Sequence, residues 1–169
     1  MAAGLMILRI APLLASTVCV TYTVAEDIYL RPFGNFRSDL RAEANRIIPG
    51  YKDRWFPPSL AVILIFYPLA ICTAVTNVLV KGNLEVPGQP GGGQQFASYC
   101  YLAGAMFNAL HFAFGPRDLA ILKRLSEKEK DNSKGMADWV RMNLVRGAIA
   151  EVPSWLCFFV GFIAATTGW

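Results

Sequence analysis

The sequence has little charge, a single histidine and no closely paired cysteines. Of its 169 residues only 17% are Asp, Glu, Lys or Arg, whereas 54% are hydrophobic. An ordinary soluble domain of this length is excluded, because it would carry more charge and would not collect its hydrophobic residues in long blocks. The net charge of +4 is small, and the basic residues alternate with acidic ones, so nucleic-acid binding is not indicated.

A metal or thiol-redox centre is not indicated either. The four cysteines stand one in each apolar block, without a CxxC pair or metal-ligand spacing, as is typical of small buried hydrophobic residues. His111 is the only histidine, and the carboxylates that could join it belong to separate predicted helices. We therefore expect no metal site.

The hydrophobic residues form four long blocks, at about residues 5–25, 58–80, 96–115 and 142–168. Each is close to the ~20 helical residues that cross ~30 Å of hydrocarbon. The pattern predicts an all-α fold, a four-transmembrane-helix bundle that forms a single integral membrane domain over residues 1–169. A signal peptide is the alternative for the first block, but no basic residue precedes its apolar core, and this favours a membrane span.

Basic residues mark two of the three predicted loops. Loop one (27–57) holds six Lys or Arg and loop three (116–141) holds seven, whereas the connection between the second and third spans holds only Lys81. Because positive residues gather on the cytoplasmic side of a membrane, loops one and three are expected to face the cytosol. Both termini would then be luminal, in the endoplasmic reticulum or another endomembrane.

Short amphipathic interfacial helices are predicted in loops one and three. In loop one the stretch NFRSDLRAEANRIIPG has helical spacing and ends in Pro-Gly, and Pro57 then opens the second span. In loop three the third span is expected to continue past a kink at Pro116, with leucines at 119, 122 and 125. NSKG would end that helix and Asp138 would cap the fourth. PGQPGGGQQ is typical of a flexible turn.

Polar residues recur at membrane depth on the cytosolic half of the predicted bundle. Trp139, Asn143 and Arg146 follow helical spacing as one stripe, and Glu151 lies about 80° round the helix from Asn143. His111 lies close to the cytosolic end of the third helix, with Asn108 on roughly the same face, and Glu26 closes the first helix on the same side. On the far half, Arg9 is expected to extend to the luminal surface and Asn77 to bond between helices.

Ionisable residues at this depth cost roughly 2.5–3.5 kcal/mol each. One interpretation is structural, an ion pair of Arg146 with Glu151 or Glu26 that fixes helix packing. The other is a small polar cavity that binds a ligand, where an imidazole beside a guanidinium and amides could act as a base with an oxyanion-binding partner.

Three stretches resemble the anthrone oxygenase family, small four-helix membrane proteins of mostly fungal polyketide pathways. They are LRIAPLLASTVCVTYTVAEDIYLRPF, NALHFAFGPR and WVRMNLVRGAIAEVPSW. The family pattern is a histidine that closes the third helix, then Trp-x3-Asn-x2-Arg, an acid, a proline and a tryptophan. In this sequence it corresponds to His111, Trp139, Asn143, Arg146, Glu151, Pro153 and Trp155. The family acid is more often Asp, so Glu151 departs from the pattern and its role stays open.

The resemblance implies oxidation of an anthrone to an anthraquinone by molecular oxygen, without flavin, haem or metal. His111 would be the base, Arg146 and Asn143 would stabilise the developing oxyanion, and Glu151 would orient the arginine or relay the proton. The substrate-binding residues would be Trp139 as a stacking wall, Asn108 and Glu26. The expected partners are a lipophilic aromatic substrate and the lipid bilayer, with a homo-oligomer left open.

Two other functions remain open at this point. An isomerase, cyclase or dehydratase acting on a lipophilic natural-product intermediate would use the same proton transfer by His111. A non-catalytic membrane scaffold would use the buried charges for packing alone. Oxygen consumption separates the first from an oxygenase, and substitution of His111 separates the second.

Overall fold

The computed structural model describes residues 2–34, 40–80, 92–127 and 131–167, and every regular element in these ranges is a helix. The first two helices are α1 (Ala2–Gly34) and α2 (Arg41–Leu79). The third segment joins α3 (Gly92–Leu110), a 3₁₀ turn (His111–Phe114) and α4 (Gly115–Leu125). The fourth joins α5 (Asn132–Arg146), a π-helical turn (Gly147–Glu151) and α6 (Val152–Thr167). The all-α prediction is confirmed.

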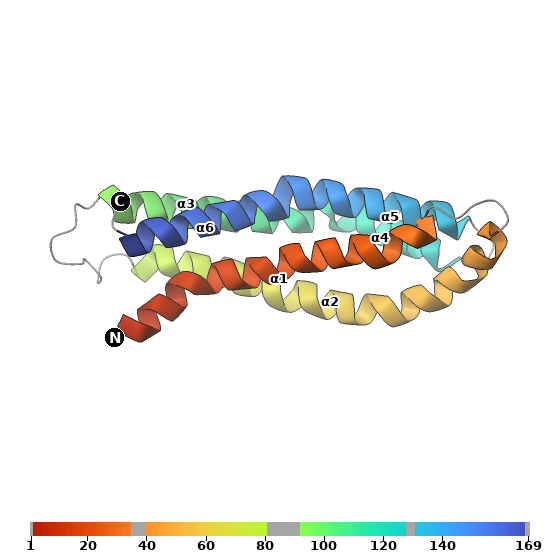
Figure 1. The fold of residues 1–169 in the computed structure, drawn as a ribbon, viewed down its shortest axis with the longest axis horizontal. Coiled ribbons are helices and arrows are strands. Elements are labelled where there is room, and N and C mark those ends of the chain that lie inside the picture. Colours follow the sequence, from red (N-terminus) through yellow and green to blue (C-terminus); the bar gives the residue numbers. More distant parts are fainter. Residues whose placement is uncertain (1, 35–39, 81–91, 128–130, 168–169) are drawn as a thin grey trace.

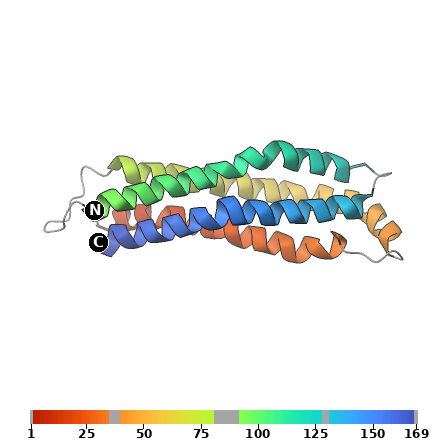
Figure 2. The ribbon, with the colours of Figure 1, turned by 90° about the horizontal axis from the view of Figure 1, so that it is seen from above.

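The four helical segments lie side by side in one elongated bundle (Figures 1 and 2). The α1 helix contacts α2, α5 and α6, and α3 runs along α6 and α2. Both labelled termini lie at the same end of the bundle (Figure 1). This end is opposite to α4 and the first turns of α5.

Three helices of the described chain are long and apolar enough to cross a membrane: residues 3–34, 41–79 and 132–167. The expected third span, 96–115, is not among them. The α3 helix has only 19 residues, and it begins with the polar sequence GGQQ. A membrane protein is thus supported, whereas a fourth span stays a prediction.

Helices α1 and α2 extend further than expected. The α1 helix runs past Glu26 to Gly34, so this carboxylate lies inside a helix rather than at its end. The α2 helix begins at Arg41 and continues through four prolines, so the expected stop after Pro49 and new start at Pro57 are wrong. A proline removes one backbone hydrogen bond and bends a helix, but packing can keep the helix continuous. Figure 1 shows α2 curving toward its Arg41 end.

The predicted course is confirmed for the third segment, but the predicted start of the fourth segment is wrong. The α3 segment does continue past Pro116 into α4, where Leu122 and Leu125 are buried as expected, whereas Leu119 is exposed. The fourth segment, however, begins at Asn132 rather than near Asp138. Asp131 is its N-cap and accepts a hydrogen bond from the Lys134 backbone N–H at 3.2 Å. The glycine expected to end a helix, Gly135, instead allows close packing, because a Cβ there would lie 2.8 Å from a Leu125 methyl. Residues 87–91 of the predicted flexible turn lie outside the described residues, and residues 92–95 belong to α3, so the predicted turn is wrong for them.

Two hydrophobic clusters stand at different levels of the bundle. One contains Ala70, Ala74, Tyr101 and Phe158 among others, and the second is built around residues such as Leu30, Ile48, Trp55 and Met136. Along each helical segment most of the buried polar residues fall between these two clusters in sequence order; Ser98, Asn132 and Ser133 are the buried polar residues outside this layer. The fold therefore confines a polar layer between two apolar layers.

Candidate functional site

The Glu151 carboxylate is the centre of the polar layer. It is 1% exposed, and it receives side chains from all four helical segments. Its Oε1 accepts a hydrogen bond from the Tyr67 hydroxyl at 2.5 Å and lies 3.1 Å from His111 Nδ1. Arg146 Nε donates to the same oxygen at 3.2 Å, and the Thr23 hydroxyl donates to Oε2. A buried carboxylate needs such partners to offset the loss of water.

The π-helical turn explains how Arg146 and Glu151 meet. In a regular α-helix five residues rotate by about 500°, which would leave the two side chains about 140° apart. The π turn has i→i+5 hydrogen bonds, of which Val152 N–H to the Gly147 carbonyl is one. This wider turn brings Glu151 back onto the face that Arg146 occupies. The sequence-based placement of Glu151, one step off the stripe, assumed a regular helix.

Arg146 is 3% exposed and binds three polar side chains. Besides Glu151, it donates from Nη1 to Asp118 Oδ2 at 2.7 Å and from Nη2 to Asn143 Oδ1 at 2.6 Å. Asn143 in turn donates to the Thr23 carbonyl at 3.0 Å, which ties α5 to α1. Asn143 and Arg146 of the predicted stripe are thus buried. They belong to a group of polar side chains around Glu151, called the buried cluster below, with Thr23, Tyr67, His111 and Asp118.

His111 opens the 3₁₀ turn at the end of α3 and is 4% exposed. Its ring lies against the Tyr67 ring, with centroids 3.8 Å apart. Asn108, one helical turn earlier, donates to the Tyr67 carbonyl at 3.4 Å. Both residues therefore reach the cluster through Tyr67, and His111 also reaches it directly through Glu151.

Glu26 joins the cluster from α1 by a longer contact. Its Oε2 lies 3.9 Å from Arg146 Nη2, and its Oε1 accepts a hydrogen bond from the Tyr22 hydroxyl at 2.9 Å. Within the described residues Glu26 Oε2 has no hydrogen-bond partner, although the side chain is buried. An incompletely bonded buried carboxylate is costly and is typical of functional sites.

The charge of the cluster is unbalanced. The three carboxylates of Glu26, Asp118 and Glu151 surround one guanidinium, so full ionisation with a neutral His111 leaves two excess negative charges. Such an excess is unfavourable in a buried site of low dielectric. Extra protons are therefore favoured in the cluster, on the imidazole or on a carboxylate. The arrangement is suited to accept and hold protons.

Trp139 lies in the polar stripe but points into the neighbouring hydrophobic cluster. Its ring packs edge-on against Trp55, with centroids 5.3 Å apart. It is 4% exposed, and its Nε1 has no hydrogen-bond partner in the described part of the chain. Its role as a wall of the substrate site stays a prediction.

Three residues of the cluster were not singled out from the sequence: Thr23, Tyr67 and Asp118. Thr23 and Tyr67 lie in apolar blocks, where a hydroxyl residue is unremarkable. Asp118 stands in a predicted cytosolic helix, where an acidic residue is expected on the solvated face. The available signal was that Asp118 lies seven residues after His111, on one helical segment.

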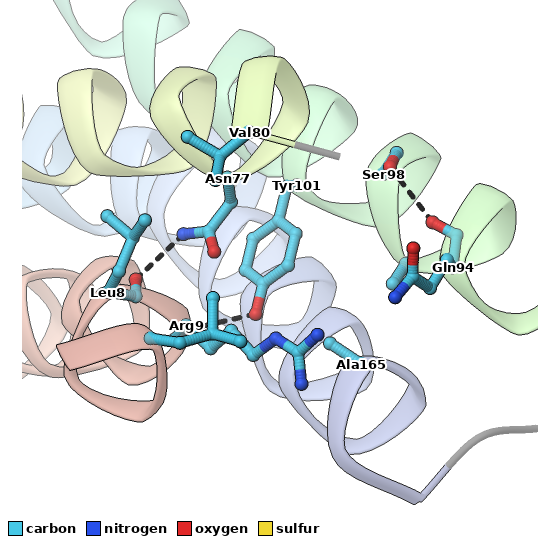
Figure 3. A pocket seen from close by; sticks show the side chains of 10 residues that line it. Leu8, Arg9, Asn77, Val80, Gln94, Ser98, Tyr101 and Ala165 are labelled. Atoms are coloured by element: carbon cyan, nitrogen blue, oxygen red, sulfur yellow. Dashed lines mark hydrogen bonds between the residues drawn. The ribbon is translucent and has the colours of Figure 1, made fainter. Parts of the chain in front are cut away.

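A second polar group lies at the far end of the bundle, around a cavity of about 30 Å³ (Figure 3). Asn77 donates to the Leu8 carbonyl at 2.7 Å, which confirms the expected bond between helices. The Tyr101 hydroxyl donates to the Arg9 carbonyl at 2.8 Å. The Arg9 guanidinium lies beside Ala165 in Figure 3. The cavity has about the volume of one water molecule, so it is too small for a substrate.

Larger cavities open on the surface of the bundle at the end nearer the cluster. Two of them have volumes of about 420 and 430 Å³, and a smaller one has about 200 Å³. The first lies between α1 and α2 and is lined by aromatic residues. The other two lie beside α5 and include charged residues. In the described residues no three His, Cys, Asp or Glu side chains gather as a metal-binding group.

Three fungal proteins are similar to this chain over almost its whole length. The probable epoxidase scpX of Mollisia scopiformis is 26% identical over 98% of this chain and 99% of its own. The epoxidase pydX of an Acremonium species is 25% identical over 95% of each chain. The epoxidase gkaX of Penicillium citrinum is 25% identical over 96% of each. No family model and no solved structure matches the chain.

These similarities support an oxygenase-like enzyme, because all three relatives carry names of oxygen-transferring enzymes. They do not extend to the narrower resemblance with anthrone oxygenases, which stays a prediction. The buried cluster holds the ionisable groups that could take part in catalysis.

Proposed function

We propose that this chain is a membrane oxygenase of natural-product biosynthesis. It removes a proton from a lipophilic, electron-rich substrate and lets the resulting carbanion react with molecular oxygen, without a resident metal or organic cofactor. The fungal relatives named epoxidases support the oxygenase class. The three helices able to cross a membrane support a substrate that partitions into lipid.

The contact between His111 Nδ1 and Glu151 Oε1, at 3.1 Å, carries the proposal. An ionised carboxylate can only accept a hydrogen bond, so a neutral His111 paired in this way carries its proton on Nδ1 and its free lone pair on Nε2. The same pairing orients the base in hydrolase triads. Among the described residues Nε2 has no hydrogen-bond partner, which leaves it as the nitrogen that would take the substrate proton. A structural ion pair alone does not require this histidine.

Arg146 supplies the positive charge that a substrate anion needs. A guanidinium has five N–H donors, and three are used by Glu151, Asp118 and Asn143. Two remain for a developing oxyanion. A fixed cation in a buried site stabilises such charge more strongly than water-exposed groups do. Asn143 holds the guanidinium in place.

The narrower form of the proposal is oxidation of an anthrone-type ring to a quinone. Loss of the methylene proton to His111 gives an aromatic, phenolate-like anion. This anion adds oxygen to give a hydroperoxide, and loss of water then leaves the quinone. Anthrone plus one oxygen molecule gives anthraquinone plus one water, so the substrate supplies all the electrons.

Epoxidation is the second candidate, because the relatives are named for it. Insertion of one oxygen atom into an alkene needs two further electrons and two protons, with the second oxygen leaving as water. The requirement for a hydride donor such as reduced nicotinamide therefore separates the two forms.

The proposed location is the endoplasmic reticulum or another endomembrane. The end of the bundle with Arg31, Arg41, Arg46 and Arg54 would face the cytosol. Both labelled termini lie at the other end (Figure 1), and in this proposed orientation they would be luminal.

The test uses the purified full chain in lipid nanodiscs with anthrone as the substrate. Oxygen uptake, quinone formation and incorporation of ¹⁸O₂ are measured with and without reduced nicotinamide, and under nitrogen. One oxygen consumed per quinone without a reductant supports the narrower form. Turnover of an alkene substrate that needs the reductant supports epoxidation. Conversion of substrate under nitrogen at the same rate would show an isomerase or cyclase and overturn the proposal.

A further inference from the structure

The cavity between α1 and α2 is a groove with aromatic walls. Its volume is about 420 Å³, within the ~300–1,000 Å³ typical of small-molecule sites. The lining residues are Tyr22 and Tyr29 from α1, and Tyr51, Arg54, Trp55, Pro58, Ser59 and Val62 from α2. Three phenol rings and an indole offer flat surfaces for a ring system, and Arg54 is the only charged residue in the lining.

A chain of hydrogen bonds lines this groove and leads inward. Trp55 Nε1 donates to the Tyr29 hydroxyl at 3.0 Å, and the Tyr29 and Tyr22 hydroxyls lie 3.2 Å apart. Tyr22 is also hydrogen bonded to Ser59 and to Glu26. The Ser59 hydroxyl donates to the Trp55 carbonyl at 2.9 Å, so toward other groups its oxygen can only accept. The hydroxyl protons of Tyr22 and Ser59 are thus used within the protein, and a ligand hydroxyl would donate to one of these two oxygens.

Tyr22 and Glu26 form the wall between the groove and the buried cluster. Tyr22 lines the groove, Glu26 accepts its hydrogen bond, and the second Glu26 oxygen lies 3.9 Å from Arg146. No other cavity described above is lined by a residue that is hydrogen bonded to Glu26. The larger cavity beside α5 is lined by three charged residues, Arg117, Asp138 and Arg141. These charges favour a polar ligand over the hydrophobic substrate proposed above.

We propose that this groove is the site where the substrate binds on arrival from the lipid. Its ligand is a flat aromatic or conjugated molecule that carries a hydroxyl group, which donates a hydrogen bond to the oxygen of Tyr22 or Ser59. The inference rests on the proposed function, since it names the substrate class and the side from which the substrate approaches. An acyl chain of a bilayer lipid could also fill the groove, but it has no polar group that could bond to the hydroxyls of Tyr22 and Ser59.

The first test blocks the groove and measures binding rather than turnover. The probe is 1,8-dihydroxyanthraquinone, which has the expected shape and oxygen atoms but no methylene hydrogen whose removal would start the oxidation. Val62→Trp puts an indole into the groove, and the matched control Leu64→Trp puts the same group on the exposed surface of α2 two residues away. Equilibrium dialysis against the full chain in nanodiscs, with empty nanodiscs as blank, gives the affinity.

We expect Val62→Trp to weaken probe binding about tenfold or more, and Leu64→Trp to leave it within about twofold of wild type. Equal binding by wild type and Val62→Trp would overturn the assignment. So would probe uptake by wild type that does not exceed empty nanodiscs.

Photolabelling of the wild type is a second test, which does not depend on whether Val62→Trp folds. The full chain is irradiated with 2-azidoanthraquinone, and the labelled peptides are mapped by mass spectrometry. Label within residues 22–29 or 51–62, displaced by 1,8-dihydroxyanthraquinone, supports the groove. Label at residues 113–117 and 138–145, or spread over all helices without displacement, contradicts it.

The two proposals fail in different ways. If the groove binds the probe but anthrone and alkenes are not oxidised, the binding site survives and the oxygenase does not. If Val62→Trp oxidises substrate at the wild-type KM and kcat, the oxygenase survives and the groove does not.

Discussion

Arg146 Nε and Glu151 Oε1 lie 3.2 Å apart, although the two residues belong to one helix and are separated by five positions. A regular helix would place them on different faces. The contact exists because residues Gly147–Glu151 form a π-helical turn, and π turns inside α-helices are frequent at functional sites. The fold therefore departs from its regular geometry at the point where the carboxylate must reach both the guanidinium and the imidazole.

The first prediction concerns His111 as the base. His111→Gln keeps a polar side chain of similar length but cannot take the substrate proton at neutral pH. We expect kcat for quinone formation to fall by about 10²–10⁴-fold, the usual contribution of a general base. Oxygen uptake in nanodiscs measures it. Asn77→Ala, at the far end of the bundle, is the control and should keep its activity. Unchanged turnover in His111→Gln would leave only a packing role for the cluster.

The second prediction separates the two functions of Glu151. Glu151→Gln removes the charge that fixes the His111 tautomer, and its amide faces donors from Thr23 and Tyr67. We expect kcat to fall by about 100-fold while KM changes little, because the groove is untouched. Asp118→Asn is the matched comparison, since Asp118 binds Arg146 at 2.7 Å, whereas among the described residues the carboxylate hydrogen bonded to His111 is that of Glu151. If both variants lose activity equally, the arginine's charge balance matters rather than the orientation of the imidazole.

The third prediction concerns the close approach of α1 and the π turn. A Cβ on Gly147 would lie 2.9 Å from the Thr23 methyl and 3.8 Å from Glu151 Oε2. Gly147→Ala should therefore lower the free energy of unfolding by about 1–3 kcal/mol, since it overpacks a buried contact. Thermal unfolding in detergent measures the change.

Gly50→Ala is the control for this glycine, because a Cβ there meets nothing within 4 Å. Within a helix the substitution should stabilise the protein by up to about 1 kcal/mol. A destabilisation of the same size in both variants would mean that loss of glycine, and not the Thr23 contact, is responsible.

The composition and spacing of the sequence predicted the helical class and most of the cluster. Burying Arg146, Asn143 and His111 at membrane depth costs free energy unless their polar groups are hydrogen bonded or ion paired. A cluster that contains all three could therefore be anticipated. Glu26 was also expected on the correct level. These residues carry their signal in their own chemistry, which does not depend on the exact helix boundaries.

The rest depended on geometry that a periodic pattern cannot show. The π turn changes the rotation between Arg146 and Glu151, and no residue type in GAIAE predicts such a turn. Tyr67 was hidden because a tyrosine in an apolar block is normally a membrane-interface or core residue. The prolines of α2 were read as helix ends, but tertiary packing around Ile48 and Trp55 holds the helix together.

The last prediction concerns Asp131, which precedes the candidate membrane span at residues 132–167. The Asp131 side chain caps the helix through the Lys134 N–H, and the hydrogen bond from Arg41 lowers the pKa of this carboxyl below its ordinary value. Asp131→Ala should cost about 1 kcal/mol of stability at pH 7, the usual worth of an N-cap. A carboxyl whose pKa is lowered by folding stabilises the protein above its unfolded pKa, and this contribution is lost as the pH falls through the folded value. The difference in melting temperature between wild type and variant should thus stay constant from pH 7 to about pH 5 and shrink below about pH 4. A difference that persists unchanged at pH 3 would show that the side chain acts by packing and not by its charge.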